Sequence, residues 1–207
     1  MLKHILPVAL LASSLLVGAA PAAAQMASNV VPASRVSTWQ IDRAHSELTF
    51  RVRHLVSRVR GSFDDWSGSV VTDPNSLANG SVQVAIKTAS INTNHERRDN
   101  HLRSADFFDA QNHPEITFRS TRVAVNGESI RIHGDLIMRG VTRPVVLEGS
   151  YLGMTRDGQG RQRMGFEAET RVNRQDFGVS WNNVTEGGGV VLGDEVTISI
   201  VVAAVQQ

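Results

Sequence analysis

The chain has 207 residues, contains no cysteine and carries 21 Lys and Arg against 20 Asp and Glu, a formal net charge of +1. The absence of cysteine excludes disulfide bonds, thiolate metal sites and cysteine nucleophiles. The balanced charge argues against nucleic acid as a partner, because phosphate binding needs a basic excess concentrated on one face.

Residues 1–24 have the pattern of a signal peptide. Lys3 precedes an apolar run over residues 5–20, and the alanines at 22–24 supply the small residues before a cleavage site at Gln25. A membrane anchor that stays attached is the alternative, but this run is shorter than the ~20 residues needed to span a bilayer. We therefore predict a periplasmic or secreted protein.

The rest of the chain suits one domain. Removal of Lys3 with the leader leaves 20 basic and 20 acidic side chains. Residues 25–36 are small, polar and contain proline, so we expect a flexible lead-in. The remaining residues, 37–207, are long enough to bury a sizeable core.

Alternation of apolar and polar residues dominates this domain. Over residues 47–53, Leu48, Phe50 and Val52 share one parity, and Thr49 and Arg51 the other. This period predicts a half-buried strand. It returns at residues 82–86, 130–138, 145–147, 164–166 and 196–202, and more weakly at 59–72.

Turn signals separate these strands. Asn126-Gly127, Asn79-Gly80 and residues 157–160 (DGQG) predict turns, the last at the tip of a long hairpin over 145–170. The sheet should therefore be antiparallel with mostly sequential pairing. The alternation changes phase between Phe118 and Val123, which predicts a bulge or bend near Ser120 or Thr121.

About eight antiparallel strands with one apolar face can close into a barrel or stack as two sheets. Closure removes the exposed edges and leaves room for packed side chains or one small ligand. A sandwich stays open as an alternative and would have no internal pocket. We predict a mainly β, extended eight-stranded antiparallel barrel.

One helix is predicted, at about residues 94–104. Thr93 and Glu96 have the spacing of a capping box. Apolar residues come late, at Leu102, Phe107 and Phe108, so the C-terminal end of the helix should pack beside the barrel while its first turns stay in solvent.

Motifs for catalysis or metal binding are weak. His95 and Asp99 are spaced i, i+4, but a metal site would need a third ligand from elsewhere, such as His101, and solvated histidines are the simpler interpretation. No serine lies in a GxSxG elbow, and Gly187–Gly189 lacks the context of a phosphate loop, so it should skirt an opening. We expect no catalytic residues, metal or cofactor.

Binding is the remaining chemistry. If the sheet closes, its inward-facing apolar residues line a tunnel suited to an aliphatic chain; the same residues could instead fill a core. We predict tail contacts from Phe50, Phe63, Trp66, Phe118, Met138, Phe166 and Trp181. Arg97, Arg98 and His101, at the polar start of the helix, are candidates for binding a head group, although pairing of the arginines with nearby carboxylates is the alternative.

Several blocks of the sequence resemble the YceI-like family of exported proteins. They include WQIDRAHSELTFRVRHL, GSFDDWSGSV, RDNHLRSADFFDAQNHPEITF, GDLIMRGVTRPVVLEG, NRQDFGVSWNN and VLGDEVTISI, and extend from about Trp39 to Val201. The resemblance implies a lipocalin-like barrel of eight strands with a helix beside it. It also implies binding of a polyisoprenoid or similar long-chain amphiphile inside the barrel, with no accepted catalytic residues.

We therefore expect an exported carrier or storage protein for an isoprenoid or fatty amphiphile, not an enzyme. Transient contact with a membrane or membrane protein is also expected, and the oligomeric state stays open, with a dimer among the choices. The alternatives are a structural or stress-related interaction protein with a filled barrel, and an unrecognised lipid hydrolase.

Overall fold

The computed structural model describes residues 35–184 and 190–207. The predicted signal peptide, most of the lead-in and the Gly187–Gly189 loop lie outside these residues. The strands are β1 (Ser37–Ile41), β2 (Glu47–His54), β3 (Ser57–Phe63), β4 (Trp66–Asp73), β5 (Ser76–Lys87), β6 (Ile91–Asn92), β7 (Glu115–Asn126), β8 (Ser129–Met138), β9 (Val141–Arg156), β10 (Gln162–Asn173) and β11 (Leu192–Gln206). Helix α1 covers Glu96–Arg103, and short 3-10 helices cover Arg43–His45, Thr88–Ser90 and Arg174–Phe177.

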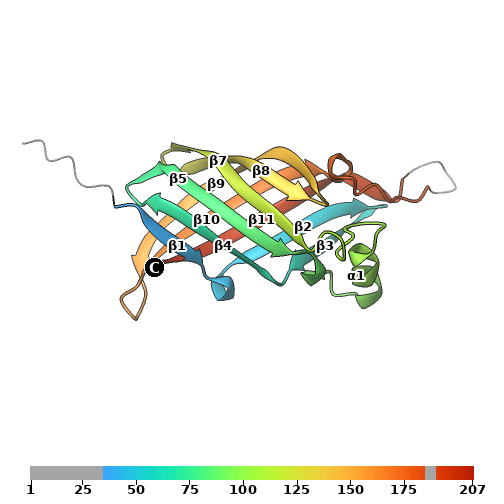
Figure 1. The fold of residues 1–207 in the computed structure, drawn as a ribbon, viewed down its shortest axis with the longest axis horizontal. Helices are drawn as coiled ribbons and strands as arrows, with labels where there is room; N and C mark the ends of the chain where they lie inside the picture. Colours follow the sequence, from blue (N-terminus) through green and yellow to red (C-terminus); the bar gives the residue numbers. More distant parts are fainter. Residues whose placement is uncertain (1–34, 185–189) are drawn as a thin grey trace, which may run out of the picture. The chain divides into compact units, whose positions relative to one another are not determined.

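These elements form a closed antiparallel barrel of eight strands with one helix (Figure 1). All pairings are antiparallel, in the order β1-β4-β5-β7-β8-β9-β10-β11-β2-β3-β6, and β1 also pairs with β11. Three pairs of consecutive strands, β1/β2, β3/β4 and β5/β6, each act as one interrupted strand. On one side, β11 pairs with both β1 and β2. On the other side, β4 pairs with β1, and β3 pairs with β2. The predicted barrel is confirmed.

The interruptions have local causes. Between β1 and β2, the Asp42 carboxylate accepts a hydrogen bond from the Ala44 N–H at 3.1 Å, which caps the 3-10 helix Arg43–His45. Between β5 and β6, the 3-10 helix Thr88–Ser90 turns the chain, so that β6 pairs with β3 and not with β7. The chain then leaves the wall for α1.

Two of the predicted turns are misplaced. The β7–β8 turn has Gly127 and Glu128 at its centre, since Asn126 pairs with Ser129, and only Gly127 has a positive φ, of 60°. A glycine at the first central position is sufficient for this type of two-residue hairpin.

Asn79-Gly80 lies inside β5 and is not a turn. The chain reverses earlier, at Pro74-Asn75, where the Asp73 carboxylate accepts a hydrogen bond from the Asn75 N–H at 2.9 Å. Proline at this place presets the backbone for a turn, and the aspartate closes it.

Other predictions for the sheet are confirmed. The register of β7 against β8 shifts between Ser120 and Arg122, at the predicted bulge. The β9–β10 hairpin turns at Asp157–Gly160, where Gly160 has a φ of 79°. The bulge bends the long β7 strand around the barrel.

Helix α1 is shorter than predicted, and the Thr93–Glu96 capping box is wrong. His95 is the N-cap, and its Nδ1 accepts from the Arg98 N–H at 3.3 Å. Thr93 instead donates its N–H and hydroxyl to the buried Asp99 carboxylate. Asp99 therefore fixes the strand-to-helix junction from inside the helix, a role that sequence spacing does not reveal.

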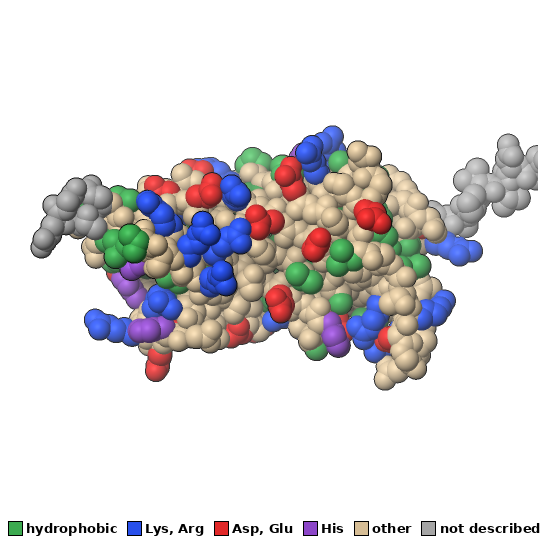
Figure 2. Space-filling view, turned by 180° about the vertical axis from the view of Figure 1, so that it is seen from behind, with side chains coloured by type: hydrophobic (Ala, Val, Ile, Leu, Met, Phe, Trp, Pro, Cys, Tyr) green, Lys and Arg blue, Asp and Glu red, His purple; other side chains and the backbone are tan. Residues whose placement is uncertain are grey.

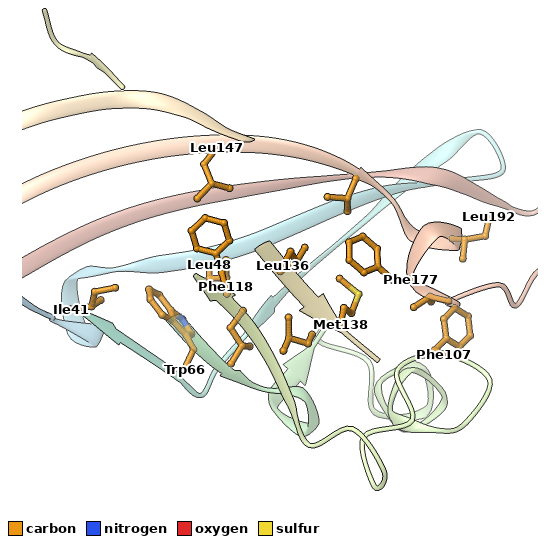
Figure 3. Packing of buried hydrophobic residues seen from close by; sticks show 14 residues of the cluster. Ile41, Leu48, Trp66, Phe107, Phe118, Leu136, Met138, Leu147, Phe177 and Leu192 are labelled. Carbon is orange, nitrogen blue, oxygen red and sulfur yellow. The ribbon is translucent and has the colours of Figure 1, made fainter. Parts of the chain in front are cut away.

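The core occupies the barrel interior and the helix end. The larger cluster contains Trp66, Phe118, Leu136 and Phe177, and also Phe107 from the segment after α1 (Figure 3). A smaller cluster of Trp39, Val70, Met164 and Ala204 packs around β1 and the C-terminal part of β11. Among the described residues, no helix is both long and apolar enough to cross a membrane.

Candidate functional site

An apolar cavity of about 210 Å³ lies inside the barrel. Its wall includes inward-facing side chains of β2, β5, β7, β8, β9, β10 and β11, together with Leu102, Phe107 and Phe108 from the helical segment. This volume is more than about ten times what one water molecule needs. The barrel is therefore not completely filled by its own side chains.

The wall offers few polar groups. Thr170 and Arg174 are among the polar exceptions in a lining that is otherwise dominated by Val, Ile, Leu and Phe. Trp66 also lines the cavity, and its indole N–H is buried without a hydrogen-bond partner among the described residues. Such a surface stabilises apolar ligands by excluding them from water and disfavours charged ones, because few groups could solvate a charge.

Six of the seven residues predicted to contact a ligand tail line this cavity. Phe118 and Trp66 project into the barrel (Figure 3). The six are Phe50, Phe63, Trp66, Phe118, Met138 and Phe166. Trp181 does not line the cavity and packs instead on Phe107, with ring centroids 5.0 Å apart. Which of these side chains touch a ligand stays a prediction.

The three residues predicted to bind a head group do not line the cavity. Arg97 is exposed on α1. Arg98 donates from Nε to the Thr93 hydroxyl at 2.7 Å and from Nη2 to the Thr93 carbonyl at 2.9 Å, so its guanidinium holds the start of the helix. The three do not converge on a common pocket, and their role at a head group remains a prediction.

His101 contacts a residue of the cavity wall. Its Nε2 lies 2.8 Å from an Asp106 carboxylate oxygen, and its ring meets the rings of Phe107 and Trp181 edge-on, with centroids 5.0 Å away in each case. Phe107 in turn lines the cavity. Any influence of His101 on a bound molecule would therefore pass through Phe107.

Aromatic side chains connect the barrel wall to the helical segment. The Phe50 and Phe63 ring centroids are 5.8 Å apart, and Phe63 meets Phe108 edge-on at 6.0 Å. Aromatic pairs at these distances stabilise by ~0.5–1.5 kcal/mol beyond the area they bury. The helical segment is therefore packed onto the barrel through Phe108, and this contact confirms the predicted anchoring.

Sequence reasoning missed Arg174 as a residue of the cavity. Arg174 is 4% exposed, and burial lowers the pKa of its guanidinium. It donates to the carbonyls of Val179, Trp181 and Gly193 and to the Asp194 carboxylate. Arg174 follows β10 in a 3-10 helix, where alternation no longer predicts which side chains point inward.

The suggested metal site finds no geometric support in the described ranges. Within residues 35–184 and 190–207, no three His, Asp or Glu side chains lie close enough to share a metal ion. His95, considered above as a ligand, caps α1, and Asp99 binds Thr93.

The sequence and the fold both match known proteins. A family model described as the YceI-like domain matches residues 39–204. Protein YceI of Escherichia coli O157:H7 is 40% identical over 172 residues, which cover 82% of this chain and 87% of the relative. The protein plu2095 of Photorhabdus laumondii is 42% identical over 134 residues, which cover 64% of this chain and 70% of the relative.

Solved structures share the fold. The YCEI protein of Campylobacter jejuni is 31% identical, with a TM-score of 0.64 over 80% of this chain and 96% of that one. A domain of Saccharophagus degradans, described as a polyisoprenoid-binding domain, has a TM-score of 0.59 at 16% identity over 82% of this chain and 98% of that one. The family model and the curated relatives together show that the chain belongs to the YceI-like domain family.

Proposed function

We propose that the protein is an exported carrier or storage protein that holds a polyisoprenoid or similar long-chain amphiphile inside its barrel. The apolar cavity carries this proposal. The polyisoprenoid-binding description of the Saccharophagus degradans domain supports the ligand class, and the signal-peptide pattern of residues 1–24 supports export. Carriage needs no catalytic group, and we assign none.

The free energies of burial and association favour a ligand with a long aliphatic chain over one with a short chain. Each buried methylene contributes ~0.8 kcal/mol, whereas association costs roughly 4–15 kcal/mol in lost freedom. A wall with so few polar groups adds little hydrogen bonding, so roughly 5–20 methylenes must be buried before binding is favourable. Polyisoprenoid tails meet this condition and small metabolites do not.

Filling the cavity tests the proposal. Ala168 lies on β10 and lines the cavity, so Ala168→Phe places a ring in the space of the ligand. Ala85, on β5, is not among the lining residues and alternates with the lining residues Val84 and Ile86; Ala85→Phe is therefore the matched control on the outer face. We expect Ala168→Phe to weaken binding of a radiolabelled polyprenol at least tenfold and Ala85→Phe to leave it unchanged.

Thermal denaturation is measured for both variants, so that a loss of binding is interpreted only where the protein is folded. Equal polyprenol binding by Ala168→Phe and the wild type, at matched stability, would contradict the proposal. Release of a cleaved product from a lipid ester would instead favour the hydrolase alternative. The intact mass of the purified protein tests export, because cleavage before Gln25 removes residues 1–24.

A further inference from the structure

Four arginines face each other on the outer side of the β2–β3 hairpin. Arg51 lies directly opposite Arg60 in the register, and Arg53 lies directly opposite Arg58. Arg51 forms an ion pair with Glu169 at 3.3 Å. Arg53, Arg58 and Arg60 are exposed, and no carboxylate within the described ranges forms an ion pair with them.

This arrangement does not help the hairpin to fold. Like charges directly opposite on neighbouring strands destabilise the pair. An external anion would remove the repulsion, and guanidinium groups are suited to phosphate because they donate two hydrogen bonds in parallel. The hairpin therefore carries a surface that gains stability when it meets a phosphate-bearing partner.

The turn between these strands is apolar. Val56 is fully exposed and Leu55 is 45% exposed, although Leu55 has a φ of 51°, a conformation in which Asn or Gly is more usual. Val190 is also exposed, next to Val191, whose carbonyl accepts from the Leu55 N–H at 2.8 Å. Exposed valine and leucine at a turn do not fit an ordinary solvent-facing loop.

We propose that this arginine hairpin, defined as Arg51, Arg53, Arg58 and Arg60 with the tip Leu55-Val56, docks the protein on a membrane of anionic phospholipid. Arg53, Arg58 and Arg60 would bind lipid phosphates while the tip enters the interface between head groups and acyl chains. Figure 2 shows basic side chains gathered near one end of the face seen from behind, with hydrophobic side chains at that end.

The apolar tip favours a membrane over other anionic partners. Nucleic acid would use the guanidinium groups but offers no apolar medium for Leu55 and Val56. A protein partner would need a hollow that matches a projecting hairpin, whereas a bilayer accepts the tip without a matching shape. The β2–β3 tip lies at the same end of the barrel as α1 (Figure 1), so docking would bring this end of the barrel to the lipid surface.

Flotation with vesicles tests the docking. The purified chain, its N-terminus defined by intact mass, is mixed with vesicles of phosphatidylglycerol and phosphatidylethanolamine, or of phosphatidylcholine alone. We expect binding to the anionic vesicles only, weakened at high salt. Each arginine near an anionic surface contributes roughly fivefold to partitioning, so Arg53→Gln with Arg58→Gln and Arg60→Gln should reduce binding roughly 100-fold.

Matched variants distinguish the effect of net charge on vesicle binding from the effect of where the arginines lie. Arg119, Arg122 and Arg143 are exposed on other strands, and their triple replacement by Gln changes the net charge equally, with little expected effect on flotation. Leu55→Asn with Val56→Ser should reduce binding roughly tenfold without loss of thermal stability, since Asn tolerates the left-handed backbone at this position.

Two results would overturn the docking surface. One is wild-type binding that does not distinguish anionic from neutral vesicles; the other is undiminished binding by the arginine triple variant. The inference does not need the proposed lipid cargo. Ala168→Phe should float like the wild type, and the triple variant should load polyprenol normally, so failure of docking and failure of carriage appear in different measurements.

Discussion

The ring of Phe118 packs directly over Gly134 on the neighbouring strand. A Cβ atom at Gly134 would lie 2.4 Å from Phe118 Cζ and 2.5 Å from the Arg119 carbonyl oxygen. Phe118 pairs with Leu136 in the register and also lines the cavity. Glycine at 134 therefore allows this ring to lie against the barrel wall and keeps the interior open.

Gly134→Ala should destabilise the protein by about 1–3 kcal/mol, because the new methyl group must displace either the Phe118 ring or the main chain. Chemical denaturation measures the loss. Gly158→Ala is the matched control: no atom lies within 4 Å of its added Cβ, at the tip of the β9–β10 hairpin. Equal stability of Gly134→Ala and the wild type would show that the ring is free to move.

The carboxyl of Asp157 should make the stability of the fold depend on pH. Burial alone raises the pKa of its carboxyl, but hydrogen bonds from Arg163, Arg161 and the Gln159 N–H outweigh burial and hold the pKa well below its usual range. A pKa that is depressed in the folded state contributes stability above the unfolded pKa of about 3.9, and this is lost as the pH falls towards the folded pKa. We expect Asp157→Asn to be less stable than the wild type near neutral pH.

The difference between Asp157→Asn and the wild type should shrink as the pH falls below about 4. Urea midpoints measured from about pH 7 down to about pH 3 test this sign. Asp135→Asn is the control, since Asp135 is exposed on β8 and forms no ion pair in the described part of the chain. A difference for Asp157→Asn that is constant across this range would disprove the linkage.

Replacing Arg174 should reduce the free energy of unfolding more than replacing any other arginine of the domain. Arg174→Met leaves the carbonyls of Val179, Trp181 and Gly193 without this donor, and it separates Asp194 from its buried partner. A buried hydrogen-bonding group left without its partner costs about 1–3 kcal/mol, so the loss comes mainly from the carbonyls, while the half-exposed Asp194 carboxylate can turn to water. Lysine should not restore the loss, because it lacks the planar set of donors.

Arg171→Met is the control for Arg174→Met. Arg171 pairs with Glu195 at 3.8 Å while more than half exposed, so we expect a change within about 0.5 kcal/mol. Comparable losses of unfolding free energy in the two variants would refute the special role of Arg174.

The strands could be predicted because alternation is a local property, whereas alternation alone allowed both a barrel and a sandwich, and the pairing of β1 with β11 decides for the barrel. Leu48, Phe50 and Val52 face inward as their parity predicts. The breaks in the long strands were not predicted, since they depend on contacts such as the Asp42 cap and on the separation of β6 from β7. The turn at Pro74-Asn75 was missed because Asn79-Gly80 offered a stronger local signal, which the pairing of β5 overrides.

The cavity could be predicted only in part. The alternation of apolar and polar residues predicted which strand residues line the cavity, including Phe118 and Met138. Arg174 and Val179 line the cavity from irregular segments, where no period exists to predict their direction. The charges on α1 suggested a head-group site, but Arg98 is engaged by Thr93, a contact between neighbours in space that spacing along the chain did not indicate.

Carriage of a long-chain amphiphile is the central claim, and organic extraction of the purified protein followed by mass spectrometry tests it most directly. We predict that about one long-chain isoprenoid or comparable amphiphile is recovered per wild-type chain. Much less should be recovered from Ala168→Phe, in which the cavity is filled. A wild-type protein that yields no such molecule, even after growth with a labelled isoprenoid precursor, would contradict the account.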